Sequence, residues 1–322
     1  MTEAVFSVRN LSVAFRRQHG LEGVVDGISF DLHAGETVAL VGESGSGKSV
    51  TAMALLGLLP AAQAETCAQR ITLGGRDLTQ LSEQQWRDVR GRDIAMIFQE
   101  PSTALDPVFT VGSQLTRVLR RRRGPHGGSV TSAALDALQA VGFANASDVF
   151  RAYPHQLSGG MRQLVMIAMA MAVRPRVLIA DEPTTALDVT TQSLVIEKLE
   201  LLKRQQDTAI LLVTHDLGVA ARCCQRAMVM YCGRLVEQAP YAQLYRHPRH
   251  PYTRGLLNAV PRIANGRPAP VDAIPGRIPA LSEWPVGCHF AARCSRADRL
   301  CRQRFPPTED LGGTRVACYH PL

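Results

Sequence analysis

The chain has 322 residues, of which 46% are hydrophobic, so it can bury a substantial core in one large domain with an appendage or in two domains. Its net charge of +8 suits nucleic acid, an anionic membrane surface or a nucleotide, and does not choose among them. No apolar run reaches the ~18 residues that span a bilayer. The N-terminus carries an acid early and lacks the apolar stretch of a secretory signal, so we expect a cytosolic protein.

The first predicted elements are strands. Residues 5–15 and 27–32 alternate apolar and polar side chains with turn residues between them, which predicts an antiparallel layer. The apolar run 37–41 predicts a buried strand, and residues 50–58 have the character of a helix.

A glycine-rich loop joins that strand to that helix. Residues 42–49, GESGSGKS, fit the phosphate-binding pattern GxxxxGK[ST], whose glycines let successive N–H groups face phosphate oxygens at a helix N-terminus. We therefore expect a nucleoside triphosphate here, with Lys48 reaching the β- and γ-phosphates and Ser49 binding Mg²⁺. The residues predicted to contact the nucleotide are Gly42, Ser44, Gly45, Ser46, Gly47, Lys48, Ser49 and Val50.

The middle of the chain predicts a helix over residues 82–91 and a short buried strand over 94–98, which places Gln99 at the end of the sheet. Residues 112–172 have helical spacing, interrupted by a loop at 124–128. The four arginines at 120–123 are typical of a solvated helix end, although a phosphate-binding patch is the alternative.

Two continuous apolar runs, 177–180 and 210–213, predict strands of a parallel sheet that is covered on both faces. Asp181 and Glu182 follow the first run, at the end of the sheet where ligands bind. We expect Asp181 to hold Mg²⁺ and Glu182 to orient and deprotonate the attacking water. A pair of buried structural acids is the alternative. His215 follows the second run and is a candidate contact for the γ-phosphate.

A second glycine-containing helix start, residues 157–163, has Ser158 as its predicted N-cap and is suited to hold a phosphate. Beyond residue 240 closely spaced prolines exclude long helices, so we place a domain boundary near residue 238. The nucleotide motif is not duplicated, which indicates one cassette.

Together these motifs resemble the ATP-binding cassette of ABC transporters over residues 5–238. The motifs that carry the resemblance are Gln99, LSGGM at 157–161, Asp181-Glu182-Pro183, Ala186-Leu187-Asp188 and His215. It implies an α/β fold: a P-loop (RecA-like) core, an antiparallel β layer and an inserted α-helical subdomain at about 100–172. It also implies that ATP and Mg²⁺ bind and that two cassettes close head to tail.

The resemblance assigns further roles. Phe15 stacks on adenine, although a core position in its strand is the alternative; Gln99 senses Mg²⁺ and the γ-phosphate. Ser158, Gly159 and Gly160 face the phosphate loop of the partner cassette, and Asp188 contacts that partner. Residues 100–111 resemble the surface that grips the membrane subunits. Leu164 departs from the family pattern, in which arginine is common after the signature glutamine.

Residues 239–322 resemble the C-terminal extension of oligopeptide and dipeptide permease ATPases, through HPYTRGLL at 250–257, Ile274-Pro275-Gly276 and a cysteine-rich end. The sequence of the phosphate loop resembles that of the D-type ATPase subunit of these permeases. This implies an importer motor at the cytoplasmic face of the inner membrane, bound peripherally, with a second, different ATPase, two transmembrane permease subunits and, indirectly, an extracytoplasmic substrate-binding protein.

Peptides are the expected cargo, and nickel or metal chelates, glutathione and opines are alternatives. A soluble ABC ATPase of nucleic-acid metabolism would tolerate the basic charge, but one cassette without sustained heptads opposes it. We therefore expect no nucleic-acid partner.

Four of the eight cysteines crowd the end of the chain, namely Cys288, Cys294, Cys301 and Cys318. Their spacing lacks the close pairs of zinc ribbons. Four thiolates suit a [4Fe–4S] cluster, which the resemblance to D-type ATPases also implies; zinc and plain buried thiols are the alternatives. Because the motif lies far along the chain from Lys48 and Glu182, we expect such a cluster to staple the proline-rich tail.

Overall fold

The computed structural model describes residues 3–18, 20–123, 129–260, 263–264, 267–268 and 272–322. The chain forms two compact units. The first comprises Met1–Phe6, Leu32–Glu36 and Gln80–Leu211, and the second comprises Ser7–Asp31, Thr37–Thr79 and Leu212–Leu322. Within the described ranges, no helix has both the length and the apolar character needed to cross a membrane.

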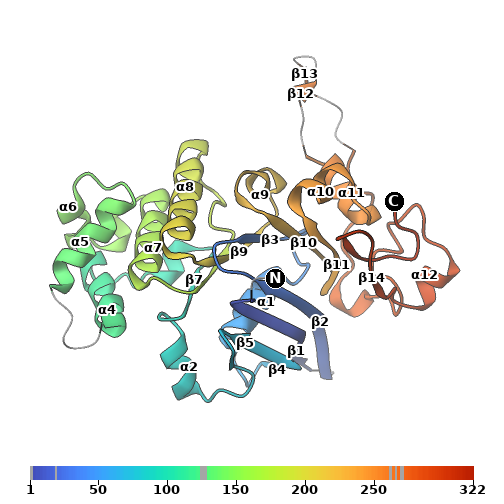
Figure 1. Ribbon diagram of the computed structural model, residues 1–322, viewed down its shortest axis with the longest axis horizontal. Coiled ribbons are helices and arrows are strands. Elements are labelled where there is room, and N and C mark those ends of the chain that lie inside the picture. Colours follow the sequence, from blue (N-terminus) through green and yellow to red (C-terminus); the bar gives the residue numbers. More distant parts are fainter. Residues whose placement is uncertain (1–2, 19, 124–128, 261–262, 265–266, 269–271) are drawn as a thin grey trace. The chain divides into compact units, whose positions relative to one another are not determined.

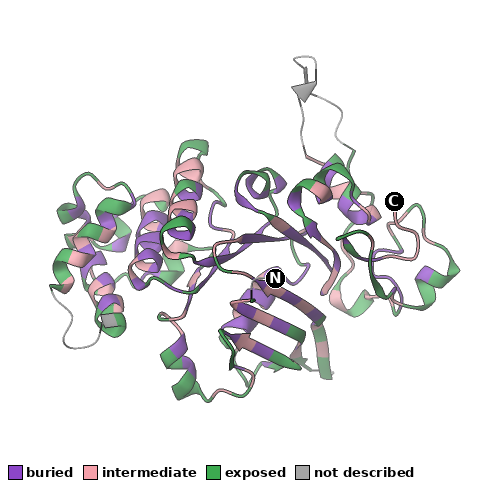
Figure 2. Ribbon diagram, in the orientation of Figure 1, coloured by how far each residue is buried: buried purple, intermediate pink, exposed green. Residues whose placement is uncertain are grey.

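The second unit contains a five-stranded sheet. Strands β2 (Gly20–Leu32), β1 (Phe6–Arg17), β5 (Arg70–Leu73) and β6 (Arg76–Asp77) follow one another in the sheet, and β4 (Ala64–Cys67) pairs with β1 antiparallel. In β1 the alternating side chains of Phe6 and Val8 are buried, and so are those of Leu11 and Val13, which gives the striped colouring of this sheet in Figure 2. Strands β1 and β2 precede the phosphate loop, as the alternating sequence predicts, whereas β4, β5 and β6 follow it and complete the sheet.

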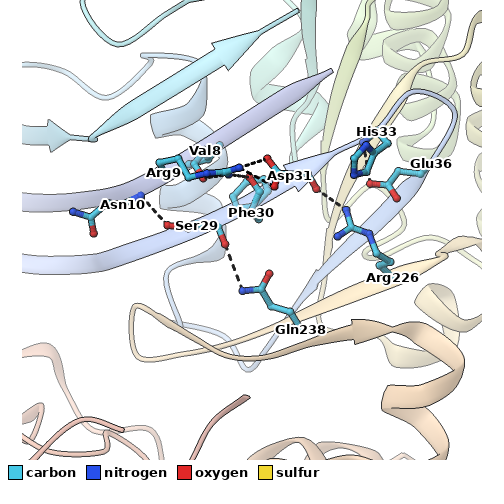
Figure 3. Close-up of polar contacts among 10 residues, drawn as sticks. All are labelled: Val8, Arg9, Asn10, Ser29, Phe30, Asp31, His33, Glu36, Arg226 and Gln238. Carbon is cyan, nitrogen blue, oxygen red and sulfur yellow. Dashed lines mark hydrogen bonds and ion pairs between the residues drawn. The ribbon is translucent and has the colours of Figure 1, made fainter. Parts of the chain in front are cut away.

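Polar side chains attach β2 to three other strands, β1 and two that follow later in the chain (Figure 3). Arg9 of β1 donates to the carboxylate of Asp31 at 2.9 Å. Arg226 of β10 (Arg226–Tyr231) donates to the Asp31 carbonyl at 2.5 Å, and Gln238 of β11 (Arg234–Pro240) donates to the Ser29 carbonyl at 3.4 Å. Backbone carbonyls at the end of β2 are thereby satisfied by neighbouring strands.

The phosphate loop follows a strand of a second sheet. Strand β3 (Thr37–Val41), buried along its whole length, pairs in parallel with β10, which pairs antiparallel with β11. The sheet continues through β15 (Arg315–Ala317) to β14 (Thr308–Asp310). Strand β11 thus runs across the boundary expected near residue 238, and a strand from the end of the chain pairs with it.

Short helices accompany these strands in the second unit, and those beyond residue 240 agree with the closely spaced prolines there. They are α1 (Lys48–Leu55), α9 (Leu217–Cys223), α10 (Tyr241–Arg246), α11 (Pro251–Asn258), α12 (Arg299–Gln303) and the 3-10 turn Leu281–Glu283. Strands β12 (Ile263–Ala264) and β13 (Arg267–Pro268) form a small antiparallel pair. Helix α1 begins at Lys48, two residues before the predicted helix.

The first unit contains a parallel strand pair and most of the helices. Strand β7 (Ile94–Ile97) pairs in parallel with β8 (Val177–Asp181), and β9 (Ala209–Thr214) begins in this unit and ends in the second. Ser82 caps α2 (Glu83–Val89) through a capping box with Gln85, which explains where that helix begins.

The helical part of the first unit agrees with the helical spacing of residues 112–172. The helices are α3 (Pro101–Ala104), α4 (Val111–Arg123), α5 (Val130–Ala140), α6 (Ala146–Arg151), α7 (Gly159–Val173) and α8 (Val189–Gln206), with a 3-10 turn at Pro154–Gln156. Helices α4, α5, α6 and α7 pack together, and α8 packs on α7 (Figure 1). The loop expected at 124–128 lies outside the described residues.

The arginine run at the end of α4 contacts backbone carbonyls. Arg121 donates to the carbonyl of Arg87, and Arg122 donates to that of Val173 at 2.8 Å, where α7 ends. These cations therefore complement carbonyl groups, as expected near a helix C-terminus.

Glu237 ties the segment before α11 to β11. Its side chain is 1% exposed and accepts hydrogen bonds from the backbone N–H groups of Arg249, at 2.7 Å, and His250, at 2.8 Å.

We expect Glu237→Ala to lower the free energy of unfolding by about 2–4 kcal/mol, because both N–H groups lose their charged acceptor. Chemical denaturation measures this loss. The exposed Glu309 on β14 offers the control, and an equal loss in Glu309→Ala would contradict the assignment.

Candidate nucleotide-binding site and cysteine pocket

The phosphate loop lies between β3 and α1, and its glycines are required by the backbone around it. A Cβ atom on Gly42 would lie 2.2 Å from the carbonyl oxygen of Met230. Gly47 has a φ of 104° and directly precedes α1. A side chain at the first position would collide with backbone, and one at the second would strain it. The loop therefore needs both glycines to keep its shape.

Lys48 is folded back onto the loop. Its side chain is 5% exposed, and Nζ donates to the carbonyl oxygens of Gly42 at 2.8 Å and Glu43 at 2.9 Å. Two carbonyl groups of the loop thus hold the ammonium group over it. Such an arrangement suits a lysine whose cation is to meet phosphate oxygens.

Two other predicted site residues lie in the same unit. Phe15 is half-buried on β1, opposite Ala64 of β4, and the Arg17 guanidinium lies 5.8 Å from the centroid of its ring. His215 is exposed and directly follows β9. The partial exposure of Phe15 is compatible with stacking and with a packing role.

The first unit carries the acidic residues. Asp181 is 4% exposed at the end of β8, and Glu182 follows it with a φ of 44°. Glu182 Oε2 accepts hydrogen bonds from Gln99 Nε2 at 3.4 Å and from Thr185 Oγ1 at 2.8 Å. The structure therefore brings together two residues that the sequence assigned to catalysis. Thr185 escaped the sequence analysis, although it lies between two recognised motifs.

The signature segment begins α7. Ser158 is the N-cap, and its Oγ accepts from the N–H of Met161 at 3.3 Å, as predicted. Gly159 has open space where a side chain would be, whereas a Cβ on Gly160 would lie 3.0 Å from Thr191. The segment thus presents backbone N–H groups at the start of a helix.

Asp188 is the N-cap of α8. Its carboxylate accepts from the N–H groups of Thr190 at 3.1 Å and Thr191 at 3.0 Å, and from Thr191 Oγ1 at 2.7 Å. These hydrogen bonds, that of the Thr191 hydroxyl above all, lower the pKa of Asp188. Thr191, which the sequence analysis did not single out, therefore lies beside both the signature glycine Gly160 and Asp188.

The four C-terminal cysteines line one cavity. The residues around it are His250, Pro251, Cys288, Phe290, Ala291, Cys294, Arg296, Ala297, Cys301, Pro306, Cys318, Tyr319 and His320. Burial raises the pKa of Cys288 to about 11, and electrostatic interactions with the three other cysteines add to that effect. Side chains far apart in the sequence are thus gathered at one place.

Other potential ligands border the cysteines. One ligand atom from each of Asp298, Cys301 and His320 lies within 4.8 Å of the others. The Asp298 carboxylate accepts from the N–H of Cys301 and lies 2.9 Å from His320 Nε2. The backbone N–H of His320 donates to Cys318 Sγ at 3.4 Å. The donor set is therefore rich in sulfur, with one imidazole and one carboxylate beside it.

His250 borders the same cavity from α11. Its side chain is 1% exposed, and Nδ1 accepts from the N–H of Tyr252 at 3.0 Å. Burial lowers the pKa of His250 to about 3, so the ring is neutral and its proton lies on Nε2. Within the described residues that atom is buried and has no hydrogen-bond partner.

Comparison with known proteins places this geometry in a family. Residues 25–185 match the ABC transporter family, and residues 236–301 match the oligopeptide/dipeptide transporter C-terminal region. The chain is 44% identical to the oligopeptide transport ATP-binding protein AppD of Bacillus subtilis, over 98% of this chain and 96% of AppD.

Two further relatives agree. The dipeptide transport ATP-binding protein DppD of Bacillus subtilis is 46% identical, covering 94% of this chain and 90% of its own length. The oligopeptide transport ATP-binding protein OppD of Salmonella typhimurium is 44% identical, over 99% of this chain and 94% of the length of OppD.

Solved structures support the fold. A dimeric bacterial ABC transporter cassette covers 73% of this chain and 98% of its own, with a TM-score of 0.65 and 24% identity. The expected α/β cassette is confirmed. The chain therefore belongs to the ABC transporter family, among the ATP-binding proteins of its oligopeptide and dipeptide branch.

Proposed function

We propose that this chain hydrolyses ATP to power the uptake of peptides through partner membrane subunits. The observation that carries the proposal is the coexistence, in one chain, of a phosphate loop with Lys48 folded onto it and a C-terminal region of the oligopeptide/dipeptide type. AppD, DppD and OppD are named for oligopeptide or dipeptide transport. Peptides are thus the favoured cargo over metal chelates, glutathione or opines.

In this proposal, each polar group at the nucleotide has one task. Lys48 binds the β- and γ-phosphates, while Ser49 and Asp181 hold Mg²⁺. Glu182 takes the proton of the attacking water, and Gln99 and His215 contact the γ-phosphate. The hydrogen bonds of Gln99 and Thr185 to Glu182 support its role, because a general base must be held in one orientation.

Two cassettes are proposed to close around ATP. Ser158, Gly159 and Gly160 would face the phosphate loop of the partner, Asp188 would contact that partner, and Phe15 would stack on adenine. The exposed helix start at Ser158 supports this, because its N–H groups suit a phosphate. ATP that contacts both halves favours the closed state, and loss of the γ-phosphate removes that preference.

The partners are proposed to be a second, different ATPase and two transmembrane permease subunits, with an extracytoplasmic substrate-binding protein acting indirectly. The chain would then lie peripherally on the cytoplasmic face of the inner membrane. Support comes from residues 100–111, where the apolar side chains of Val108 and Phe109 are 73% and 38% exposed. Exposed apolar side chains close together mark a surface for another protein.

We further propose a [4Fe–4S] cluster in the cysteine pocket, with Cys288, Cys294, Cys301 and Cys318 as its ligands. Four sulfur atoms around one cavity fit this group, and the buried Nε2–H of His250 fits as a donor to its sulfur atoms. When bound, the cluster would cross-link the tail. The grouping of Asp298, Cys301 and His320 favours zinc as the second candidate, because zinc accepts mixed ligands.

Glu182→Gln tests the catalytic assignment. We expect ATP to bind as in the wild type and turnover to fall by about 10²–10⁴, the usual scale for losing a general base. Steady-state hydrolysis and nucleotide titration on the assembled transporter measure the two quantities. Glu197→Gln, an exposed change on α8, is the control, and wild-type turnover in Glu182→Gln would contradict the role.

Val108→Asp tests the docking surface. We expect it to abolish copurification with the coexpressed permease subunits and peptide uptake by the cells, since a charge would have to be desolvated at the interface. ATP binding by the isolated chain should not change. Val286, which is 89% exposed in the extension, provides the matched control Val286→Asp. Normal assembly and uptake with Val108→Asp would exclude this surface.

Metal analysis tests the cysteine pocket. Anaerobically purified protein should contain about four iron and four acid-labile sulfide per chain, and Cys294→Ser should lose them. Cys67→Ser, at an exposed cysteine on β4, should keep them. Zinc at about one per chain would establish the mixed-ligand site instead. Protein without metal under these conditions would remove the cofactor and leave the ATPase assignment standing.

A further inference from the structure

We propose that Arg293 and Tyr252, both in the C-terminal extension, are positioning residues for the phosphate loop and that they set its affinity for ATP. The inference rests on the proposed role of that loop. The residues that carry it all belong to the second unit.

Both residues hold the same loop residue, Glu43. Arg293 forms a bidentate ion pair with its carboxylate, Nη1 to Oε2 at 2.8 Å and Nη2 to Oε1 at 3.1 Å. The hydroxyl of Tyr252 accepts the backbone N–H of Glu43 at 2.9 Å. The Arg293 side chain is 6% exposed and that of Glu43 is 30% exposed, so the pair is partly shielded from the solvent that weakens surface ion pairs.

Glu43 is also where the loop holds Lys48. The carbonyl of Glu43 accepts from Lys48 Nζ, and its N–H and carboxylate are held by the extension. Every polar group of this residue is thus fixed, and its fixed position determines where the ammonium group of Lys48 lies. A lysine positioned before ATP arrives loses less conformational freedom on binding.

The charge of Arg293 is a second reason to expect that it affects ATP binding. Glu43 places a carboxylate in a loop whose proposed ligand is a polyanion, and like charges at close range repel. Arg293 compensates that carboxylate directly. Without Arg293, the negative charge of Glu43 would oppose the phosphates, so ATP binding depends on a cation supplied from 250 positions along the chain.

The supports behind Arg293 and Tyr252 are rigid. Arg293 Nε donates to the carbonyl of Pro275 at 2.8 Å. The rings of Tyr252 and Tyr231 are both fully buried, with centroids 4.6 Å apart, and Phe290 lies 5.3 Å from each. Packed aromatic rings of this kind have little rotational freedom, so the hydroxyl and the guanidinium group are presented to Glu43 in one geometry.

Arg293→Met is the principal test, with the ATP dissociation constant measured on the full chain and KM and kcat measured on the assembled transporter. We expect ATP affinity to fall and KM to rise by about tenfold or more, with kcat at saturating ATP within about twofold, because the catalytic groups are intact. Arg293→Lys should recover part of the affinity. Arg299→Met, an exposed arginine of α12, should bind ATP as the wild type does.

A double-mutant cycle separates charge compensation from a general loss of packing. Glu43→Gln should weaken ATP binding far less than Arg293→Met, and the double variant should bind better than Arg293→Met alone, since no unpaired carboxylate remains. Additive effects would overturn the proposal. Tyr252→Phe keeps the ring and removes the hydroxyl; it should raise KM by about threefold or more and provides the test if Arg293→Met does not fold.

Lys48→Ala distinguishes this inference from the proposed function. It should abolish ATP binding, and normal affinity in that variant would contradict the phosphate loop itself. If Lys48→Ala loses binding while Arg293→Met and Tyr252→Phe both bind ATP with wild-type affinity, the loop is correct and the positioning role is wrong.

Discussion

The phosphate loop depends on the parallel pairing of β3 with β10. In that register Val41 lies opposite Val229, so the next residue, Gly42, meets the carbonyl of Met230 at a separation that excludes a side chain. The loop leaves the sheet at this contact and reaches α1 at Lys48. Because β3 and β10 are buried along almost their whole length, their register is fixed by the core. The register of β3 and β10 therefore determines the conformation of the loop where it leaves the sheet.

Strand and helix positions were largely predictable because their signals are local. Continuous apolar runs predicted β3, β8 and β9, and the segment 82–91 predicted the helix that the structure shows as α2. Gln99 and Glu182, each assigned to the nucleotide site from its place after a strand, form a hydrogen bond to one another. Glycines in turns, helix caps and acids at strand ends constrain only the few residues around them. Such local constraints can be recognised in the sequence.

Long-range partners were not predictable in the same way. Thr191 lies beside Gly160 only because α7 and α8 pack together, and the ion pair of Arg293 with Glu43 joins two ends of the chain. The cysteine motif lies far along the chain from Lys48, yet Arg293, next to Cys294, contacts the phosphate loop. Distance along the chain was a poor measure, because β15 pairs with β11 and returns the tail to the sheet.

This strand pairing also bears on how the chain can be divided. A protein cut near residue 238 would keep every recognised nucleotide motif, but it would remove β15 and end within β11. The unpaired N–H and C=O groups of β11 would then be open to another molecule's strand, a known cause of aggregation. We therefore regard the isolated cassette as an unsound experimental unit: poor solubility of such a fragment would reflect an uncovered sheet edge and not the behaviour of the whole chain.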